Sequence, residues 1–154
     1  MATEYGFVYV LANPAMPGLY KIGFTTQSVQ VRISDLSRGT SVPAAFYKVL
    51  DITTYNPAAV ERDVHLILRD ARSNARREFF QFTSDTEAAA SVLVAAGQSG
   101  FYQPVTDNRA GDALYAKPEP VKEISEQEMK LRQIRAKHYI AHFRAILDGE
   151  VTYE

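Results

Sequence analysis

The stretch YGFVYVLANPAMPGLYKIGF occupies residues 5–24 and predicts a β-hairpin. Its two ends, residues 5–11 and 19–24, are rich in the β-branched and aromatic residues that favour strands. Asn13-Pro14 and Pro17-Gly18 lie between these ends and are typical of turns. The fold is therefore expected to begin with two antiparallel strands.

A turn centred on Ala15 places Tyr9 opposite Lys21. Because side chains alternate along a strand, Tyr9 and Lys21 share one face and Tyr20 points to the other. Gly23 leaves an open position beside the lysine. This pattern predicts a phenol and an ammonium group next to a gap, although an aromatic strand with a lysine reaching into water gives the same pattern.

The remaining chain alternates helical and extended patterns. The expected elements are a helix at 28–38, a strand at 46–54, a helix starting at Asn56-Pro57, a short extended or helix-starting segment at 76–82, a helix from Ser84 or Asp85 to about 96, and a helix from 124 to about 147. We therefore predict an α+β fold with a small, three-stranded, mainly antiparallel sheet flanked by helices. Residues 1–97 would form the domain, 98–120 a linker, and 121–154 a C-terminal helical extension that docks back on the domain.

The composition is that of one folded domain with an appendage. The chain has 154 residues, of which 46% are hydrophobic and 23% charged, which excludes disordered and collagen-like classes. It has no cysteine, so any metal site needs carboxylate, imidazole or oxygen ligands. The net charge of −1 gives no general basic field. In the absence of a signal-peptide pattern or a membrane-spanning run, we expect a cytoplasmic protein.

Two further charged residues stand beside apolar segments. Arg32 lies on or beside the apolar face of the predicted helix 28–38, so its guanidinium needs a carboxylate, a bound anion or water at the edge of that face. Glu78 lies between Arg77 and Phe79-Phe80. It could simply pair with Arg77. A single carboxylate is, however, also the usual protein ligand of Mg²⁺ when water and substrate phosphates complete the shell.

Four segments together carry a family resemblance: Phe7-Val8-Tyr9, Tyr20-Lys21-Ile22-Gly23, Arg32 and Arg77-Glu78-Phe79-Phe80. In this order they resemble the GIY-YIG nuclease superfamily, and more narrowly its phage-encoded and meiotically up-regulated subgroup, in which the second tripeptide reads Lys-Ile-Gly. The likeness covers residues 6 to about 95. It implies hydrolysis of phosphodiester bonds in DNA with one divalent metal ion.

The resemblance also implies a role for each residue of the four segments. Glu78 would hold Mg²⁺ or Mn²⁺, and Tyr9 would deprotonate the attacking water. Lys21 would favour the phenolate of Tyr9, and Arg32 would stabilise charge on the phosphate. Tyr20, Gly23 and His65 are expected to lie around these four groups.

His65 follows Glu61 by four residues, so the two share a helix face and could bind a metal or relay a proton. The favoured interpretation is a partly buried histidine that joins the helix to the sheet through a hydrogen bond, or supports the site from behind.

The sequence departs from the family pattern at two positions. Phe7 stands where the first tripeptide has glycine, which is an ordinary strand position. Phe24 stands where many relatives carry a basic residue that helps to orient the water. This second departure favours an alternative function, a catalytically weak or inactive module that binds nucleic acid or regulates on the same fold.

Basic residues near Glu78 and in the last helix are candidate phosphate contacts: Arg69, Arg72, Arg76, Arg77, Lys130 and Arg135. The predicted partner is DNA, with RNA left open. The same cations would also suit a solvated helix surface, which is the alternative for the last helix.

Overall fold

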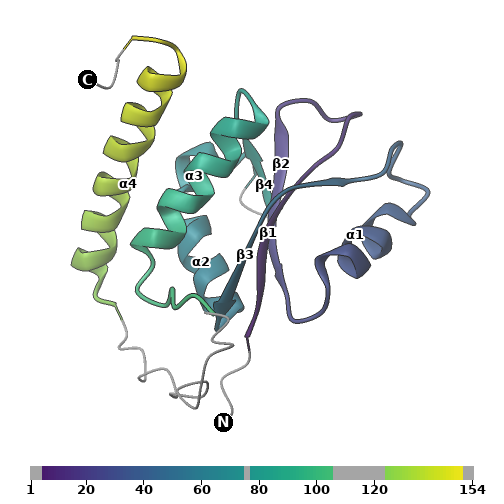
Figure 1. The fold of residues 1–154 in the computed structure, drawn as a ribbon, viewed down its shortest axis with the longest axis horizontal. Helices are drawn as coiled ribbons and strands as arrows, with labels where there is room; N and C mark the ends of the chain where they lie inside the picture. Colours follow the sequence, from purple (N-terminus) through teal and green to yellow (C-terminus); the bar gives the residue numbers. More distant parts are fainter. Residues whose placement is uncertain (1–4, 75–76, 106–123, 151–154) are drawn as a thin grey trace, which may run out of the picture.

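The structure is a computed structural model that describes residues 5–74, 77–105 and 124–150. Within these residues one antiparallel sheet has the strand order β3-β1-β2-β4 (Figure 1). The strands are β1 (Tyr5–Ala12), β2 (Leu19–Thr25), β3 (Tyr47–Tyr55) and β4 (Phe79–Gln81). The predicted antiparallel sheet is confirmed. The three expected strands are joined by a fourth, β4, because part of the segment 76–82 is extended and pairs with β2.

The hairpin of β1 and β2 forms as predicted, but its register differs by two residues. Tyr9 pairs with Gly23 instead of Lys21, so the turn centres on Met16 instead of Ala15. The cause is a pair of consecutive backbone turns. The amide of Met16 donates to the carbonyl three residues earlier at 2.9 Å, and its carbonyl accepts from the amide three residues later at 3.2 Å. A shift of two residues keeps every side chain on its predicted face.

The helices are α1 (Val29–Ser37), α2 (Pro57–Ile67), α3 (Asp85–Gln98) and α4 (Glu126–Leu147), with a 3₁₀ turn at Arg69–Ala71. Three of them begin at a serine cap: Ser28, Ser84 and Ser125 each accept a hydrogen bond from the backbone amide three residues on. None of the helices in the described parts of the chain is long and apolar enough to cross a membrane.

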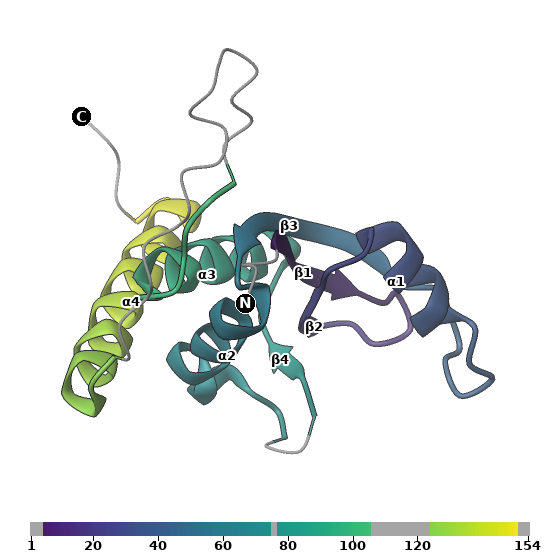
Figure 2. The same cartoon turned by 90° about the horizontal axis from the view of Figure 1, so that it is seen from below.

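The helices cover both faces of the sheet (Figures 1 and 2). Alternation along the strands separates two groups of buried residues. On the side of α1, the group comprises Tyr9, Leu11, Val29, Ile33 and Phe46. On the side of α2 and α3, the larger group includes Val8, Val10, Ile22, Val60, Val64 and Val92. The sheet is therefore buried on both faces, and of the helices that the structure describes, α1 is the one that covers the face carrying Tyr9 and Lys21.

The C-terminal helix α4 packs against α3 and α2, on the side of the sheet away from α1 (Figure 2). Ala136 is fully buried in this contact. Arg144 pairs with Glu87 of α3 at 3.3 Å, and Lys137 pairs with Asp70 after α2. The last helix thus docks on the domain, as the sequence predicts.

Most of the predicted linker 98–120 lies outside the described residues. Its described part runs beside β3, where the amide of Tyr55 donates to the carbonyl of Gln103 at 3.0 Å. Thr54 also forms a bridge with Pro104. The division into a domain, a linker and an extension remains a prediction.

Two substitutions in α4 test its docking. Ala136→Glu would bury an unpaired carboxylate, because Ala136 is 0% exposed, whereas Ile134→Glu places the same charge in water, because Ile134 is 65% exposed. We expect the first to lower the free energy of unfolding by about 2–4 kcal/mol and the second to change it by less than about 0.5 kcal/mol. Urea unfolding of both variants measures this, and equal effects would contradict a docked helix.

Candidate functional site at the open edge of the sheet

The site begins with Tyr9, whose side chain crosses the hairpin above Gly23. A Cβ atom at Gly23 would lie 2.6 Å from the hydroxyl oxygen of Tyr9, so only glycine leaves room for the ring in this position. Arg32 reaches the same hydroxyl from α1, and its Nε–H donates to Tyr9 Oη at 3.3 Å. The cation beside the phenol is thus Arg32, and the prediction that Lys21 faces Tyr9 is wrong.

The hydroxyl of Tyr9 lies in a partly desolvated, charged environment. Burial raises the pKa of Tyr9 above its ordinary value of 10.0, the hydrogen bond from Arg32 opposes this rise, and the charge of Glu78 adds to it. The bond to Tyr9 raises the pKa of Arg32, and Glu78 contributes to that rise as well. Tyr9 is therefore protonated at neutral pH in the free protein, with a guanidinium already placed to stabilise its phenolate.

Lys21 and Glu78 form the second pair of the site. Lys21 Nζ lies 3.1 Å from Glu78 Oε2, and the two side chains are 14% and 44% exposed. The backbone holds Glu78 in place, because the amide of Ile22 donates to the carbonyl of Glu78 at 3.1 Å. Lys21 also lies over the ring of Phe79, 5.5 Å from its centroid. Glu78 thus pairs with β2, and this contact replaces the local pair with Arg77 that the sequence left open.

A third pair comes from α2 and closes the edge of β2 beyond β4. β4 pairs with β2 only from Leu19 to Lys21. At the next residue, Ile22, the carbonyl oxygen lies 2.8 Å from Nε2 of His65. The same Nε2 lies 3.1 Å from Glu61 Oε1. Because the carbonyl can only accept, Nε2 carries the proton. His65 therefore joins the helix to the sheet by a hydrogen bond, which is the interpretation that the sequence favoured.

Glu61 is the residue of this group whose role the sequence does not reveal. Burial raises its pKa from 4.5 to about 7, and the charge of Glu78 adds to this, while Arg72 and Lys21 act in the opposite direction. Burial also lowers the pKa of His65. The four-residue spacing between Glu61 and His65 was the available signal, but it could not reveal that the carboxylate is buried within reach of Glu78's charge.

The three residues expected around the site have different positions. Gly23 lies directly opposite Tyr9 in the hairpin, and His65 lies at the edge of β2. Tyr20, by contrast, points to the other face of the sheet and donates to Asp85 Oδ1 at the start of α3, at 2.7 Å. Tyr20 therefore supports the packing of α3 and does not touch the four predicted groups.

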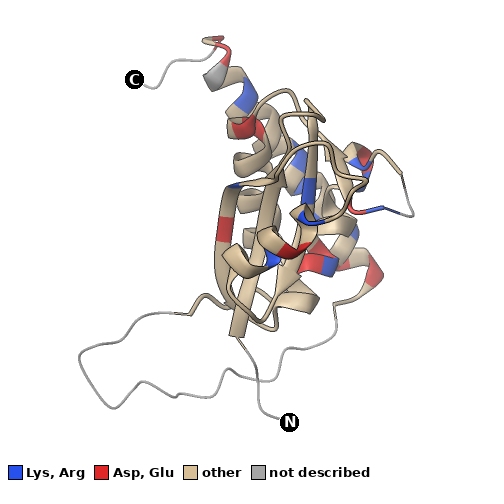
Figure 3. Ribbon diagram, turned by 90° about the vertical axis from the view of Figure 1, so that its right-hand side faces the viewer, with Lys and Arg blue, Asp and Glu red and all other residues tan. Residues whose placement is uncertain are grey.

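The arginines that precede β4 are held close to the chain. Arg72 donates from Nε to the carbonyl of Arg77 at 3.0 Å, and its guanidinium lies 5.9 Å from the centroid of the Phe80 ring. Arg69 lies 3.9 Å from Asp70, and Arg76 lies outside the described residues. Figure 3 shows that basic and acidic residues alternate over the side of the molecule that carries α1. Phosphate contacts by these arginines remain a prediction.

The two predicted phosphate contacts on α4 lie away from Tyr9 and Arg32, because α4 and α1 are on opposite sides of the sheet (Figure 1). Lys130 pairs with Glu126 at 3.1 Å, and Arg135 is exposed on the same helix. If these residues bind nucleic acid, they do so at a distance from Tyr9 and Arg32.

The charged groups set a limit on how a metal ion could bind. Among the residues that the structure describes, no three or more Asp, Glu or His side chains are grouped to hold a metal ion. The carboxylate of Glu78 is half-exposed. This fits the way Mg²⁺ is bound by one carboxylate, water and substrate phosphate oxygens.

The fold and this cluster define a small α+β protein with a charged site at the open edge of an antiparallel sheet. Residues 6–94 match the T5orf172 domain, and the chain belongs to this family. The domain occurs in phage and nuclease-like proteins, which points to a nuclease-like or DNA-binding role. No curated protein and no solved structure matches the chain.

The raised pKa of Glu61 predicts a specific pH dependence of stability. A carboxyl with a folded-state pKa of about 7 and an ordinary value of 4.5 contributes stability below pH 4.5 that is lost as the pH rises through 7. Glu61→Gln keeps the acceptor for His65 and removes the titration. We therefore expect the variant to gain stability over the wild type between pH 5 and pH 8, by on the order of 2 kcal/mol.

Urea unfolding of both proteins at the two pH values measures this gain. The lowered pKa of His65 also affects the pH dependence of stability, but both proteins contain His65, so its effect largely cancels in the comparison. A difference in stability that is the same at pH 5 and pH 8 would show that Glu61 titrates normally.

Proposed function

We propose that the chain is a divalent-metal-dependent endonuclease of the GIY-YIG type, and that it hydrolyses phosphodiester bonds in DNA. The observation that carries this proposal is the convergence of Tyr9 with Arg32 and of Lys21 with Glu78 at one edge of the sheet. These side chains come from β1, α1, β2 and the segment before β4. Membership of the T5orf172 family supports the proposal.

Tyr9 is the proposed general base. Tyr9 would first lose its own proton to solvent, and the Nε–H of Arg32 would stabilise the resulting phenolate. The phenolate would then take the proton of the attacking water and become a phenol again. This modifies the role expected for Lys21, because the guanidinium, and not the ammonium, touches the phenol. The remaining N–H groups of Arg32 would donate to the phosphate oxygens as their charge increases.

Glu78 is the proposed metal ligand. It would hold Mg²⁺ or Mn²⁺, which supplies Lewis-acid polarisation of the scissile phosphate and stabilises charge on the leaving oxygen. Lys21, 3.1 Å from Glu78, would orient this carboxylate before DNA arrives. Glu61 and His65 would fix the edge of β2 on which Lys21 is carried.

A second candidate function is a DNA-binding or regulatory module without turnover. Phe24 favours it, because it provides no cation where many proteins of the GIY-YIG superfamily carry one. The pairing of Glu78 with Lys21 points the same way, because it already neutralises the carboxylate. RNA is the second substrate to test under either function.

Nicking of supercoiled plasmid in Mg²⁺ or Mn²⁺ tests the proposal. We expect the wild type to nick, and Tyr9→Phe and Glu78→Ala each to lower the rate at least about 100-fold, because a positioned base and the metal ligand are lost. DNA affinity should remain within about threefold of that of the wild type.

Tyr139→Phe is the matched control, because Tyr139 is an exposed tyrosine on α4 and its loss should leave the rate unchanged. If the Tyr9→Phe variant nicks at the wild-type rate, Tyr9 is not the base. Binding without nicking by the wild type would support the module without turnover.

A further inference from the structure

An exposed aromatic ring adjoins the proposed site. Phe24 is 41% exposed and directly follows Gly23, the residue over which the Tyr9 ring lies. Side chains alternate along β2, so Phe24 projects toward α2 while Lys21 and Gly23 face α1. Its position is beyond the end of β4, which pairs with β2 only as far as Lys21. A ligand that meets both Phe24 and the proposed reacting groups would therefore have to cross the edge of β2.

Phe24 lines a hollow of about 450 Å³, which we call the Phe24 hollow. Its walls include Pro57 at the start of α2 and the ring of Phe101, with Thr26 and Asn56 as polar residues at the side. None of the described residues that line it is acidic. Hollows of this size accept small flat ligands, and apolar walls with a few polar groups suit a planar ring that carries hydrogen-bonding edges.

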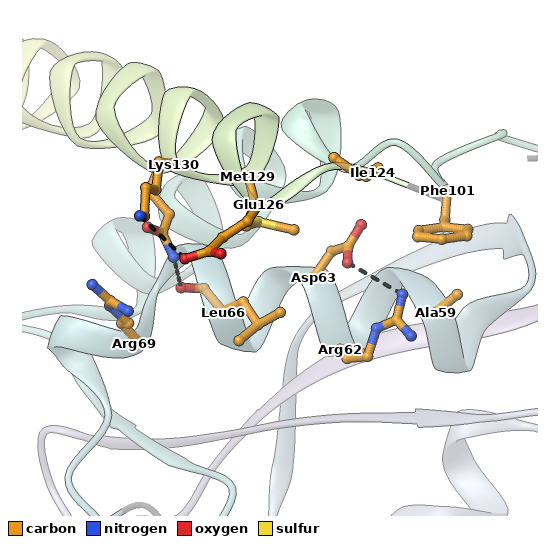
Figure 4. Close-up of a pocket in the computed structure, with 11 residues that line it drawn as sticks. Ala59, Arg62, Asp63, Leu66, Arg69, Phe101, Ile124, Glu126, Met129 and Lys130 are labelled. Atoms are coloured by element: carbon orange, nitrogen blue, oxygen red, sulfur yellow. Dashed lines mark hydrogen bonds and ion pairs between the residues drawn. The ribbon is translucent and has the colours of Figure 1, made fainter. Parts of the chain in front are cut away.

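A cation lies at one end of the Phe24 hollow. There, the guanidinium of Arg62 stacks on Phe101, 5.1 Å from the ring centroid. Lys21 and Arg32 belong to the proposed site, on the other face of β2. Phe101 and Ala59 also line a second groove of about 610 Å³ along α2 (Figure 4).

The second groove also has basic residues in its lining. It leads from Phe101 past Leu66 to Arg69 and Lys130, as Figure 4 shows. Asp63 and Glu126 also line it, and they pair with Arg62 at 3.7 Å and Lys130 at 3.1 Å, so the cations there are partly neutralised. An apolar hollow with a guanidinium at one end matches the chemistry of a nucleotide, which joins a flat, neutral base to anionic phosphates.

We propose that the Phe24 hollow receives an unpaired nucleobase next to the phosphate at the proposed site, so that the preferred substrate is DNA with single-stranded or unstacked nucleotides at that position. This inference rests on the proposed function. Inside a duplex both faces of a base are stacked on its neighbours, so a base can lie on Phe24 only when it has left the stack. Stacking on an exposed aromatic ring accepts any base and therefore gives little sequence preference.

A fluorescence titration of DNA binding tests the inference and does not require cleavage. The chain has no tryptophan, so Phe24→Trp introduces a single indole in the hollow. Phe143→Trp is the matched control, because Phe143 is also 41% exposed but lies on α4. Each variant is titrated in EDTA with a short single-stranded oligothymidylate and with a blunt duplex. We expect saturable quenching by the single strand for Phe24→Trp and none for Phe143→Trp.

A second variant measures what the ring contributes to binding. Phe24→Leu keeps an apolar side chain but cannot stack. We expect it to weaken binding of the single strand roughly 5- to 100-fold, the range for loss of one base–aromatic stack. Duplex affinity should change less than about twofold, and circular dichroism checks that both variants are folded.

The outcomes separate the two proposals. Quenching without plasmid nicking by the wild type supports the base-binding hollow and rejects the hydrolase. If the wild type nicks but Phe24→Trp shows no quenching, the base-binding role of the Phe24 hollow is rejected and the endonuclease proposal stands. The same holds if Phe24→Leu loses single-strand and duplex affinity equally. If neither nucleic acid binds, the inference is wrong whatever the plasmid assay shows.

Discussion

The site depends on one close approach, that of the Tyr9 ring to the backbone of Gly23. A side chain at position 23 would need the space that the phenol fills, so the ring can lie flat across the hairpin only because Gly23 has none. This places the hydroxyl where Arg32 can reach it from α1. The register of β1 and β2 sets this approach, because a shift of two residues would put Lys21 opposite Tyr9.

The shortness of β4 is the second feature that shapes the site. Because β4 pairs with only part of β2, the next carbonyl of β2 is available to His65, and the adjacent edge stays open beside Phe24. The same short strand begins just after Glu78 and carries it to Lys21. An edge strand that stops early thus positions the proposed metal ligand and leaves Phe24 beyond its end. Natural sheets usually protect such edges, and here α2 does so in part through the contact of His65 with the carbonyl of Ile22.

Much of this architecture could be predicted from local patterns. Strand alternation placed Tyr9 and Lys21 on one face, and serine caps and apolar spacing located the helices to within a few residues. The register could not be predicted, because Asn13 and Gly18 indicate a turn but do not fix that two consecutive backbone turns centre it on Met16. The segment 76–82 predicts β4 only in part, because three residues are too short for their pattern to separate a strand from the start of a helix, and pairing with β2 decides between them. The burial of Glu61 and the exposure of Phe24 result from tertiary packing at the sheet edge, which spacing alone cannot show.

The central claim is that Tyr9, Arg32, Lys21 and Glu78 act on one phosphate. A crystal structure of the Tyr9→Phe variant with Mn²⁺ and an oligonucleotide tests it most directly, because the anomalous signal of manganese locates the ion. The account predicts an ion about 2.1–2.2 Å from an oxygen of Glu78 that also contacts a phosphate oxygen, with Arg32 donating to the same phosphate. An ion bound elsewhere, or a phosphate held only by Arg69 and Arg72, would contradict it.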